Sequence, residues 1–227
     1  MIITNFRNFR NIVASFLIPL FICLAQVHAF TVVLDPGHGG IYSGARNKCG
    51  LQEKELTLTI AKKIETLLMK KKIRVQLTRT NDTQLDTDLL KDLKKRAHAS
   101  TLHKADAFIS LHFNNSSNPD IRGYELYVPR ITMFKSSCYT LAGSIHHQLS
   151  QTLEYKGGGS LGNLNLFDRG IRAAEFNVLR NHTCPAVLIE LEYITHTTQA
   201  RKLASDAYLN TLAQAIAQGI LAYSKHN

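Results

Sequence analysis

Apolar and polar positions along the first half of the chain repeat with two different periods, which predict strands and helices in turn. The run TVVLD at 31–35 is apolar and β-branched and predicts a buried strand, while apolar residues at helical spacing across 53–72 predict an amphipathic helix. The segment IRVQLTR at 73–79 alternates as a strand does, and 88–104 returns to helical spacing. The apolar run AFISLHF at 107–113 then predicts a third strand.

The second half of the chain continues this alternation around one glycine-rich segment. Three strands are expected at 124–128, 176–180 and 186–194, and two helices at 138–153 and 199–225. The segment at 156–166 is expected to be a loop, because glycine-rich sequence of this kind cannot pack a core. Strands that alternate with helices predict an α/β fold, a single layered domain with a mainly parallel or mixed central sheet flanked by helices.

Residues 1–29 have a pattern of their own and predict a secretory signal peptide. Arg7 and Arg10 precede an apolar run, and small residues follow before the expected cleavage point. A membrane anchor is the alternative, but the run has about 14 residues where a spanning helix needs roughly 20, and it contains Pro19. We therefore expect 30–227 to be one exported domain, periplasmic or secreted, with no stable membrane insertion after cleavage.

Composition narrows the class of protein and its partners. The chain is 44% hydrophobic and 19% charged, which is typical of a globular domain with a real core. Its formal net charge of +10 favours polyanionic partners, and for an exported protein these are cell-wall polymers and anionic membrane surfaces rather than nucleic acid. Outside the signal segment the cysteines are odd in number and lack CxxC spacing, so Cys49, Cys138 and Cys184 are expected to be buried or free thiols.

Three residues with metal-ligating side chains lie where predicted strands end or a helix begins, which is where the working groups of α/β sheets collect. His38 follows the first strand within PGHGG, Glu53 begins the first helix, and His112 lies near the end of the third strand. Two imidazoles and one carboxylate, with a fourth position left to water, are a common catalytic zinc set. Each has a structural alternative: either histidine could be structural, and Glu53 could complement the positive end of its helix.

A further carboxylate, Glu190, lies near the close of the apolar strand PAVLIELEY. Burying a carboxylate is costly unless it is paired or used, so we interpret Glu190 as a general base beside the metal. The alternative is a structural ion pair with Arg79 or Arg96. Glu192 is a rival base, which we expect strand alternation to direct to the opposite face.

Nine blocks of sequence, in order across residues 32–195, resemble the zinc-dependent N-acetylmuramoyl-L-alanine amidases, also called the amidase type 3 family. The blocks are VVLDPGHGG (32–40), LQEKELTLTIA (51–61), VQLTRTND (75–82), KRAHAS (95–100), ADAFISLHFN (105–114), RGYELYV (122–128), FDRGIR (167–172), FNVLRN (176–181) and PAVLIELEYIT (185–195). The resemblance implies one Zn²⁺ ion held by His38, Glu53 and His112, with Glu190 as the catalytic residue. It also implies the reaction, hydrolysis of the amide between N-acetylmuramic acid and L-alanine of the peptidoglycan stem peptide.

The chain departs from the family pattern directly after Glu190. Glu192, Tyr193, Thr195 and His196 stand where the family has glycine, phenylalanine and a serine-asparagine pair, which puts substrate contacts rather than the ligands in doubt. Some relatives cover their zinc with an inserted helix. Between Tyr127 and Asp168 there is room for only one helix and its loops, so we expect an uncovered, competent, monomeric enzyme. Two alternatives remain: a zinc peptidase that cuts within the stem peptide, and an inactive peptidoglycan-binding module.

Overall fold

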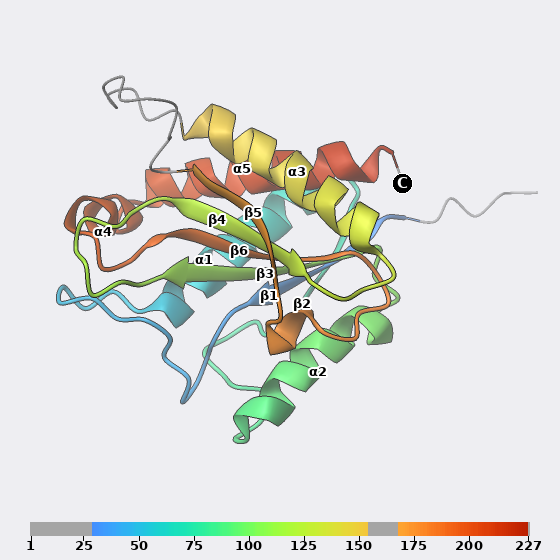
Figure 1. Ribbon diagram of the computed structural model, residues 1–227, viewed down its shortest axis with the longest axis horizontal. Helices are drawn as coiled ribbons and strands as arrows, with labels where there is room; N and C mark the ends of the chain where they lie inside the picture. Colours follow the sequence, from blue (N-terminus) through green and yellow to red (C-terminus); the bar gives the residue numbers. More distant parts are fainter. Residues whose placement is uncertain (1–28, 154–167, 227) are drawn as a thin grey trace, which may run out of the picture.

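The apolar strands predicted at 31–35 and 107–113 lie side by side in a six-stranded mixed sheet, and neither is an edge strand (Figure 1). The computed structural model describes residues 29–153 and 168–226. The strands are β1 (Thr31–Pro36), β2 (Arg74–Leu77), β3 (Ala107–Asn114), β4 (Tyr124–Pro129), β5 (Asp168–Ala174) and β6 (Ala186–Tyr193). The helices are α1 (Glu53–Met69), α2 (Leu89–Leu102), α3 (Lys135–Thr152), α4 (Thr197–Leu203) and α5 (Asp206–Ser224), with a short 3-10 helix η1 (Asn177–Leu179).

The strand order is β2-β1-β3-β6-β4-β5, and it decides where functional groups can meet. β2, β1, β3 and β6 are parallel, so their carboxyl ends share one edge of the sheet. β4 runs antiparallel to β6, and β5 runs parallel to β4. The carboxyl ends of β1, β3 and β6 therefore meet the amino end of β4. Ligands of open α/β sheets bind outside the carboxyl ends of the strands, so this edge is where a site is expected.

Helices cover both faces of the sheet, which is why the central strands are apolar on both sides. α1, α3 and α5 pack on one face, where the larger cluster of buried side chains includes Ile60, Leu141 and Ile216. α2 and η1 cover the other face around a smaller cluster that includes Phe108 and Leu179. Figure 1 shows α3 and α5 above the sheet and α2 below it. Among the described helices, none has a stretch both long and apolar enough to cross a lipid bilayer.

The predicted fold class is confirmed, a single α/β domain with a mixed sheet flanked by helices, but two elements differ from expectation. The strand predicted at 176–180 is wrong, because Leu179 N–H and Arg180 N–H bond to carbonyls three residues back and close a 3-10 turn. The sheet position beside β4 is taken instead by β5, whose half-buried pattern at a sheet edge gave no apolar signal. The helix predicted at 199–225 is split near Ser205, whose extended backbone caps α5.

The predicted signal peptide and glycine-rich loop are not tested by the structure. Residues 1–28 and the segment at 156–166 lie outside the described residues. Both therefore stay predictions.

Candidate active site

The His38 turn places an imidazole at the carboxyl end of β1, and the sequence PGHGG makes the turn sterically feasible. His38 has a positive φ of 63°, an uncommon conformation for a residue with a side chain. A Cβ atom on Gly37 would lie 2.3 Å from His112 Cε1, and one on Gly44 would lie 2.5 Å from Glu53 Oε2. Glycine at these two positions therefore allows the His38 and Glu53 loops to approach the rest of the site.

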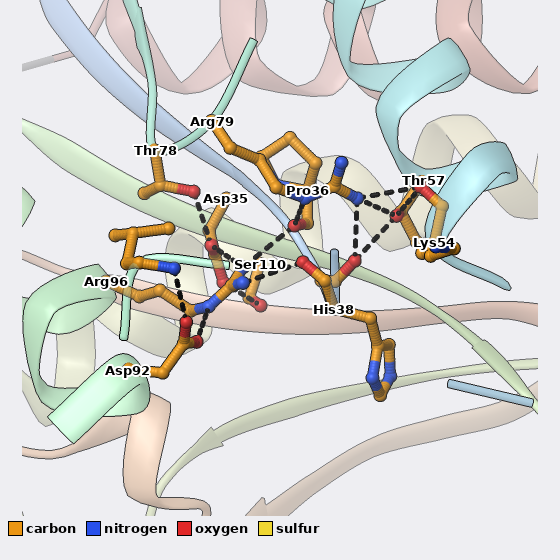
Figure 2. A network of polar contacts seen from close by, with 12 residues as sticks. Asp35, Pro36, His38, Lys54, Thr57, Thr78, Arg79, Asp92, Arg96 and Ser110 are labelled. Carbon is orange, nitrogen blue, oxygen red and sulfur yellow. Dashed lines mark hydrogen bonds and ion pairs between the residues drawn. The ribbon is translucent and has the colours of Figure 1, made fainter. Parts of the chain in front are cut away.

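Two buried arginines bind the backbone carbonyls of this turn (Figure 2). Arg79 donates from Nε to the Pro36 carbonyl and from Nη2 to the Gly37 carbonyl, both at 2.9 Å. Arg96 donates from Nη2 to the His38 carbonyl at 2.6 Å and from Nη1 to the Pro36 carbonyl at 2.9 Å. We call Arg79 and Arg96, with the carboxylates of Asp35 and Asp92, the cradle. Figure 2 shows the His38 imidazole directed away from it. The arginines thus fix the turn by its carbonyls and leave the imidazole free for a ligand.

Arg96 is itself neutralised by two buried carboxylates, which makes its burial affordable in free energy. Its Nη1 lies 2.9 Å from Asp35 Oδ1 and its Nε lies 2.5 Å from Asp92 Oδ1. Burial by itself would raise the pKa of Asp35, but Arg96 and the hydroxyls of Thr78 and Ser110 outweigh it and hold that pKa below its ordinary value. Every member of the cradle therefore has partners of the opposite polarity.

The three predicted ligands come together at the strand ends. Glu53 Oε1 lies 3.1 Å from His38 Nε2 and 2.9 Å from His112 Nδ1, and one ligand atom from each of the three residues lies within 4.8 Å of the others. Each could offer one coordinating atom to a single ion. The group therefore fits a divalent metal ion of the kind that nitrogen and oxygen donors bind.

Glu53 is the pivot of this group, and backbone donors fix its carboxylate. It is 4% exposed; its Oε1 accepts from the Phe113 N–H at 3.0 Å and its Oε2 from the Ala45 N–H at 2.8 Å. Burial would raise the pKa of Glu53, but hydrogen bonds to His112 and His38 dominate and lower it far below its ordinary value. Burial lowers the pKa of His112, but the hydrogen bond to Glu53 and the negative charges of Glu190, Glu53 and Asp35 outweigh it and raise that pKa. Glu53 is therefore anionic at neutral pH, as a metal ligand must be.

Glu190 lies beside His112, because β3 and β6 are neighbouring strands whose register pairs these two residues. Within the described residues its Oε2 is buried and has no hydrogen-bond partner. Burial, together with the negative charges of Glu53 and Glu125 and against the influence of His112, raises the pKa of Glu190 to about 7. The structural alternative of an ion pair between Glu190 and Arg79 or Arg96 is wrong. Arg79 binds the Pro36 carbonyl and Arg96 binds Asp35 instead.

The rival Glu192 does not face the ligand group, although the reason that we expected is wrong. Residues two apart on a regular strand share a face, so alternation alone would put Glu192 beside Glu190. The register of β6 against β3 shifts between Glu190 and Tyr193, as at a β-bulge, so Glu192 lies within the irregular stretch. Glu192 Oε1 accepts from Gln199 Nε2 and Tyr208 Oη at 3.1 and 2.9 Å. Glu192 is therefore a structural residue that ties β6 to α4 and α5.

Sequence reasoning missed one carboxylate of the site, Glu125. β4 pairs Glu125 with Glu190, and Glu125 is 3% exposed. Its Oε1 accepts from Asn114 Nδ2 at 2.8 Å, and its Oε2 lies 3.7 Å from Arg169 Nε and 3.6 Å from Arg172 Nη1. The signal was present in YELYV, where a glutamate lies inside an apolar strand just as Glu190 does.

His196, one of the departures from the family pattern, has a structural role in the described residues. Its Nδ1 accepts from the Gln199 N–H at 3.3 Å and caps the amino end of α4. Burial and nearby Arg122 lower the pKa of His196, which keeps the capping nitrogen unprotonated at neutral pH. The substitution therefore shapes the β6–α4 connection.

The sheet and this site define an α/β protein with a His-Glu-His group that can bind a metal ion at the ends of its parallel strands. The chain belongs to the N-acetylmuramoyl-L-alanine amidase family, whose sequence profile matches residues 32–222. It is 35% identical over 190 residues to an endolysin of Bacillus phage SPP1, covering 83% of this chain and 64% of that protein. It is 34% identical over 193 residues to the amidase LytC of Bacillus subtilis, covering 85% of this chain but 35% of LytC.

Solved structures agree with the sequence comparisons. The amidase AmiC2 of Nostoc punctiforme superposes with a TM-score of 0.71 at 34% identity, covering 86% of this chain and 97% of that one. An N-acetylmuramoyl-L-alanine amidase from Clostridium difficile 630 superposes with a TM-score of 0.75 at 33% identity, covering 87% and 97% of the two chains. The described fold is thus that of these two solved amidase chains.

Proposed function

We propose that the protein is a zinc-dependent N-acetylmuramoyl-L-alanine amidase that hydrolyses the amide between N-acetylmuramic acid and L-alanine of peptidoglycan. The observation that carries the proposal is the convergence of His38, Glu53 and His112 within 4.8 Å. Glu190 lies on the neighbouring strand, and its buried Oε2 has no hydrogen-bond partner among the described residues. Family membership supplies the substrate, and the donor set of two imidazoles and one carboxylate supports zinc.

In this mechanism His38, Glu53 and His112 would hold the ion, and Glu190 moves the proton. When bound, zinc supplies positive charge that polarises the amide carbonyl and acidifies water. Glu190 accepts a proton from the attacking water and passes it to the leaving nitrogen. His112 lies opposite Glu190, so base and ligand are fixed by one pair of strands.

The decisive experiment is digestion of purified peptidoglycan by the protein, with mass analysis of the products. We expect free stem peptides that begin with L-alanine, no cleavage after chelation, and recovery when Zn²⁺ is added. Products cut within the stem peptide would replace the amidase by a zinc peptidase. Binding without any product would leave the inactive wall-binding module.

The same assay tests the proposal that the enzyme is competent alone. In the described residues, the one helix between β4 and β5 is α3, whose Leu141, Ile145 and Leu149 pack into the core. We therefore expect digestion by the purified monomer without an activator. A protein that stays inert until a partner is added would contradict this expectation.

Export is part of the proposal, because the substrate lies outside the cytoplasm. The signal pattern of residues 1–29 and the net charge of +10 support delivery to, and retention on, a polyanionic wall. Amino-terminal sequencing of the protein recovered from the cell envelope or medium should begin at Phe30. Recovery of the uncleaved chain from the cytoplasm would contradict export.

A further inference from the structure

A large cavity lies beside the proposed active site and is not used by the reaction described above. It has a volume of about 670 Å³. Its walls are the loop before α1, the segment after β3, and the connection from β6 into α4; they include Arg46, Lys48, Ser116, Thr195 and Arg201. Each wall comes from a different part of the chain, so the cavity exists only in the folded protein.

The three walls continue directly from the residues of the active site. Leu51 of the first wall is two residues before Glu53, Ser116 is four residues after His112, and Thr195 is five residues after Glu190. At a rise of about 3.3 Å per residue, the four residues from His112 to Ser116 span at most roughly 13 Å. A peptide held at the ligand group reaches that distance with about its fourth residue.

Hydrogen bonds between the walls fix the shape of the cavity. Asn47 Nδ2 donates to the Ile194 carbonyl at 3.3 Å and so ties the first wall to the end of β6. The Ser116 N–H donates to Thr195 Oγ1 at 3.0 Å and ties the second wall to the third. The cavity is therefore braced on all three sides, as a binding site needs to be.

The charge of the cavity is entirely positive. Its lining includes three cationic side chains, Arg46, Lys48 and Arg201, and no carboxylate. Across the described ranges, none of these three forms an ion pair, whereas Lys54 and Lys63 pair with aspartates at 2.6 Å. Three unpaired cations around one concave space attract an anionic ligand.

We propose that this cavity binds a carboxylate of the acidic stem peptide, on the amine side of the bond that is cut. The inference rests on the proposed function for the identity of the substrate. Arg46 of the first wall and Arg201 of the third would bind the carboxylate, and Lys48 adds to the attractive field. The site would make the enzyme prefer stem peptides with free carboxylates over those whose carboxylates are amidated.

The kinetic test compares Arg46→Gln/Arg201→Gln with a matched double variant, Arg130→Gln/Arg180→Gln. The control arginines are also exposed and flank Glu175 at the far end of β4. On muropeptides with free carboxylates, we expect the cavity variant to lose about tenfold in kcat/KM through KM, since each exposed pair contributes modestly. On the amidated muropeptide it should match wild type, and the control should match wild type on both. An equal loss on both substrates, or no loss, would overturn the proposal.

A binding test separates this inference from the proposed function. Cys49 lines the cavity and is exposed, while Cys138 and Cys184 are buried, so alkylation followed by mass spectrometry of the Cys49 peptide reports on occupancy. In Glu190→Gln protein, the free-carboxylate muropeptide should slow alkylation of Cys49, and the amidated one should not. If wild type cleaves no substrate but this protection is seen, the proposed function fails and the cavity stands. Protection only by a phosphate-rich wall polymer, or by neither muropeptide, would overturn the cavity proposal.

Discussion

The two sides of the ligand group differ in how their buried charges are satisfied. On the side of the His38 turn, Arg96 forms ion pairs with Asp35 and Asp92. It also donates to the backbone carbonyls of Pro36 and His38. On the neighbouring strands β6 and β4, Glu190 and Glu125 lie opposite each other in the register. Each has a buried Oε2 without a hydrogen bond among the described residues. Both regions lie in a medium of low polarity, where a satisfied charge is held firmly and an unsatisfied one is costly.

The two regions therefore have different roles in the site, one in positioning and one in proton transfer. The network of Arg96, Asp35 and Asp92 fixes the position of the His38 turn. Its charges are all paired, so it is not suited to exchange protons. The under-satisfied carboxylate keeps a raised pKa and is the group suited to accept a proton. A substitution in the Arg96 network should therefore lower the stability of the protein and disturb the positions of the ligands. A substitution at Glu190 or Glu125 should instead change proton transfer.

The largest expected effect is on catalysis through Glu190. Glu190→Gln keeps the shape of the side chain and removes the base, so kcat should fall by about 10²- to 10⁴-fold. Zinc content should stay close to wild type, and the variant should remain folded. Glu175→Gln, an exposed glutamate far from the ligand group, is the matched control and should keep full activity. A kcat within tenfold of wild type in Glu190→Gln would remove the base from its role.

The next effect is on stability through Arg96. Arg96→Met leaves Asp35 and Asp92 buried without their cation, and we expect a loss of about 3 to 5 kcal/mol in the free energy of unfolding. Urea denaturation measures this loss, and Arg130→Met at an exposed site is the control. The double change Asp35→Asn/Arg96→Met should recover part of the loss. A loss under about 1 kcal/mol would show that the cradle does not hold the turn.

A smaller effect should appear in the pH dependence of stability of the metal-free protein. The pKa of Glu190 is raised from 4.5 to about 7 on folding, so its contribution to stability is present below pH 4.5 and is lost as pH rises to about 7. Glu190→Gln should therefore gain on wild type across that window, by up to about 3 kcal/mol, and level off above it. Urea midpoints measured from pH 4 to 8 give the difference, and a constant difference would contradict the raised pKa.

The smallest effect should come from Glu125. Its negative charge helps to raise the pKa of Glu190, so Glu125→Gln should shift the acid limb of kcat/KM to lower pH. Zinc content should be unchanged, because Glu125 is not one of the three ligands. An acid limb that stays in place would show that Arg169 and Arg172 already screen Glu125 fully.

Local pattern was sufficient for most of the elements and for the residues that could serve as ligands. β1, α1, α2 and β3 follow the predicted periods, and His38, Glu53 and His112 stand at their ends. The failures fall where the pattern is weak or irregular: β5 at a half-buried edge, η1 in place of a strand, and the register shift that separates Glu192 from Glu190. In each case contacts with other segments override the local preference.

By itself, the sequence determined the order of strands and helices, the glycines that let His38 and Glu53 approach, and the chemistry of the candidate ligands. These follow from interactions within a few residues, which leave a periodic trace in the chain. Tertiary structure alone decided that Glu125 lies opposite Glu190, that Arg79 and Arg96 serve the His38 turn, and that a cationic cavity opens beside the ligands. Those depend on register and packing between segments far apart in the chain, for which the local pattern carries no signal.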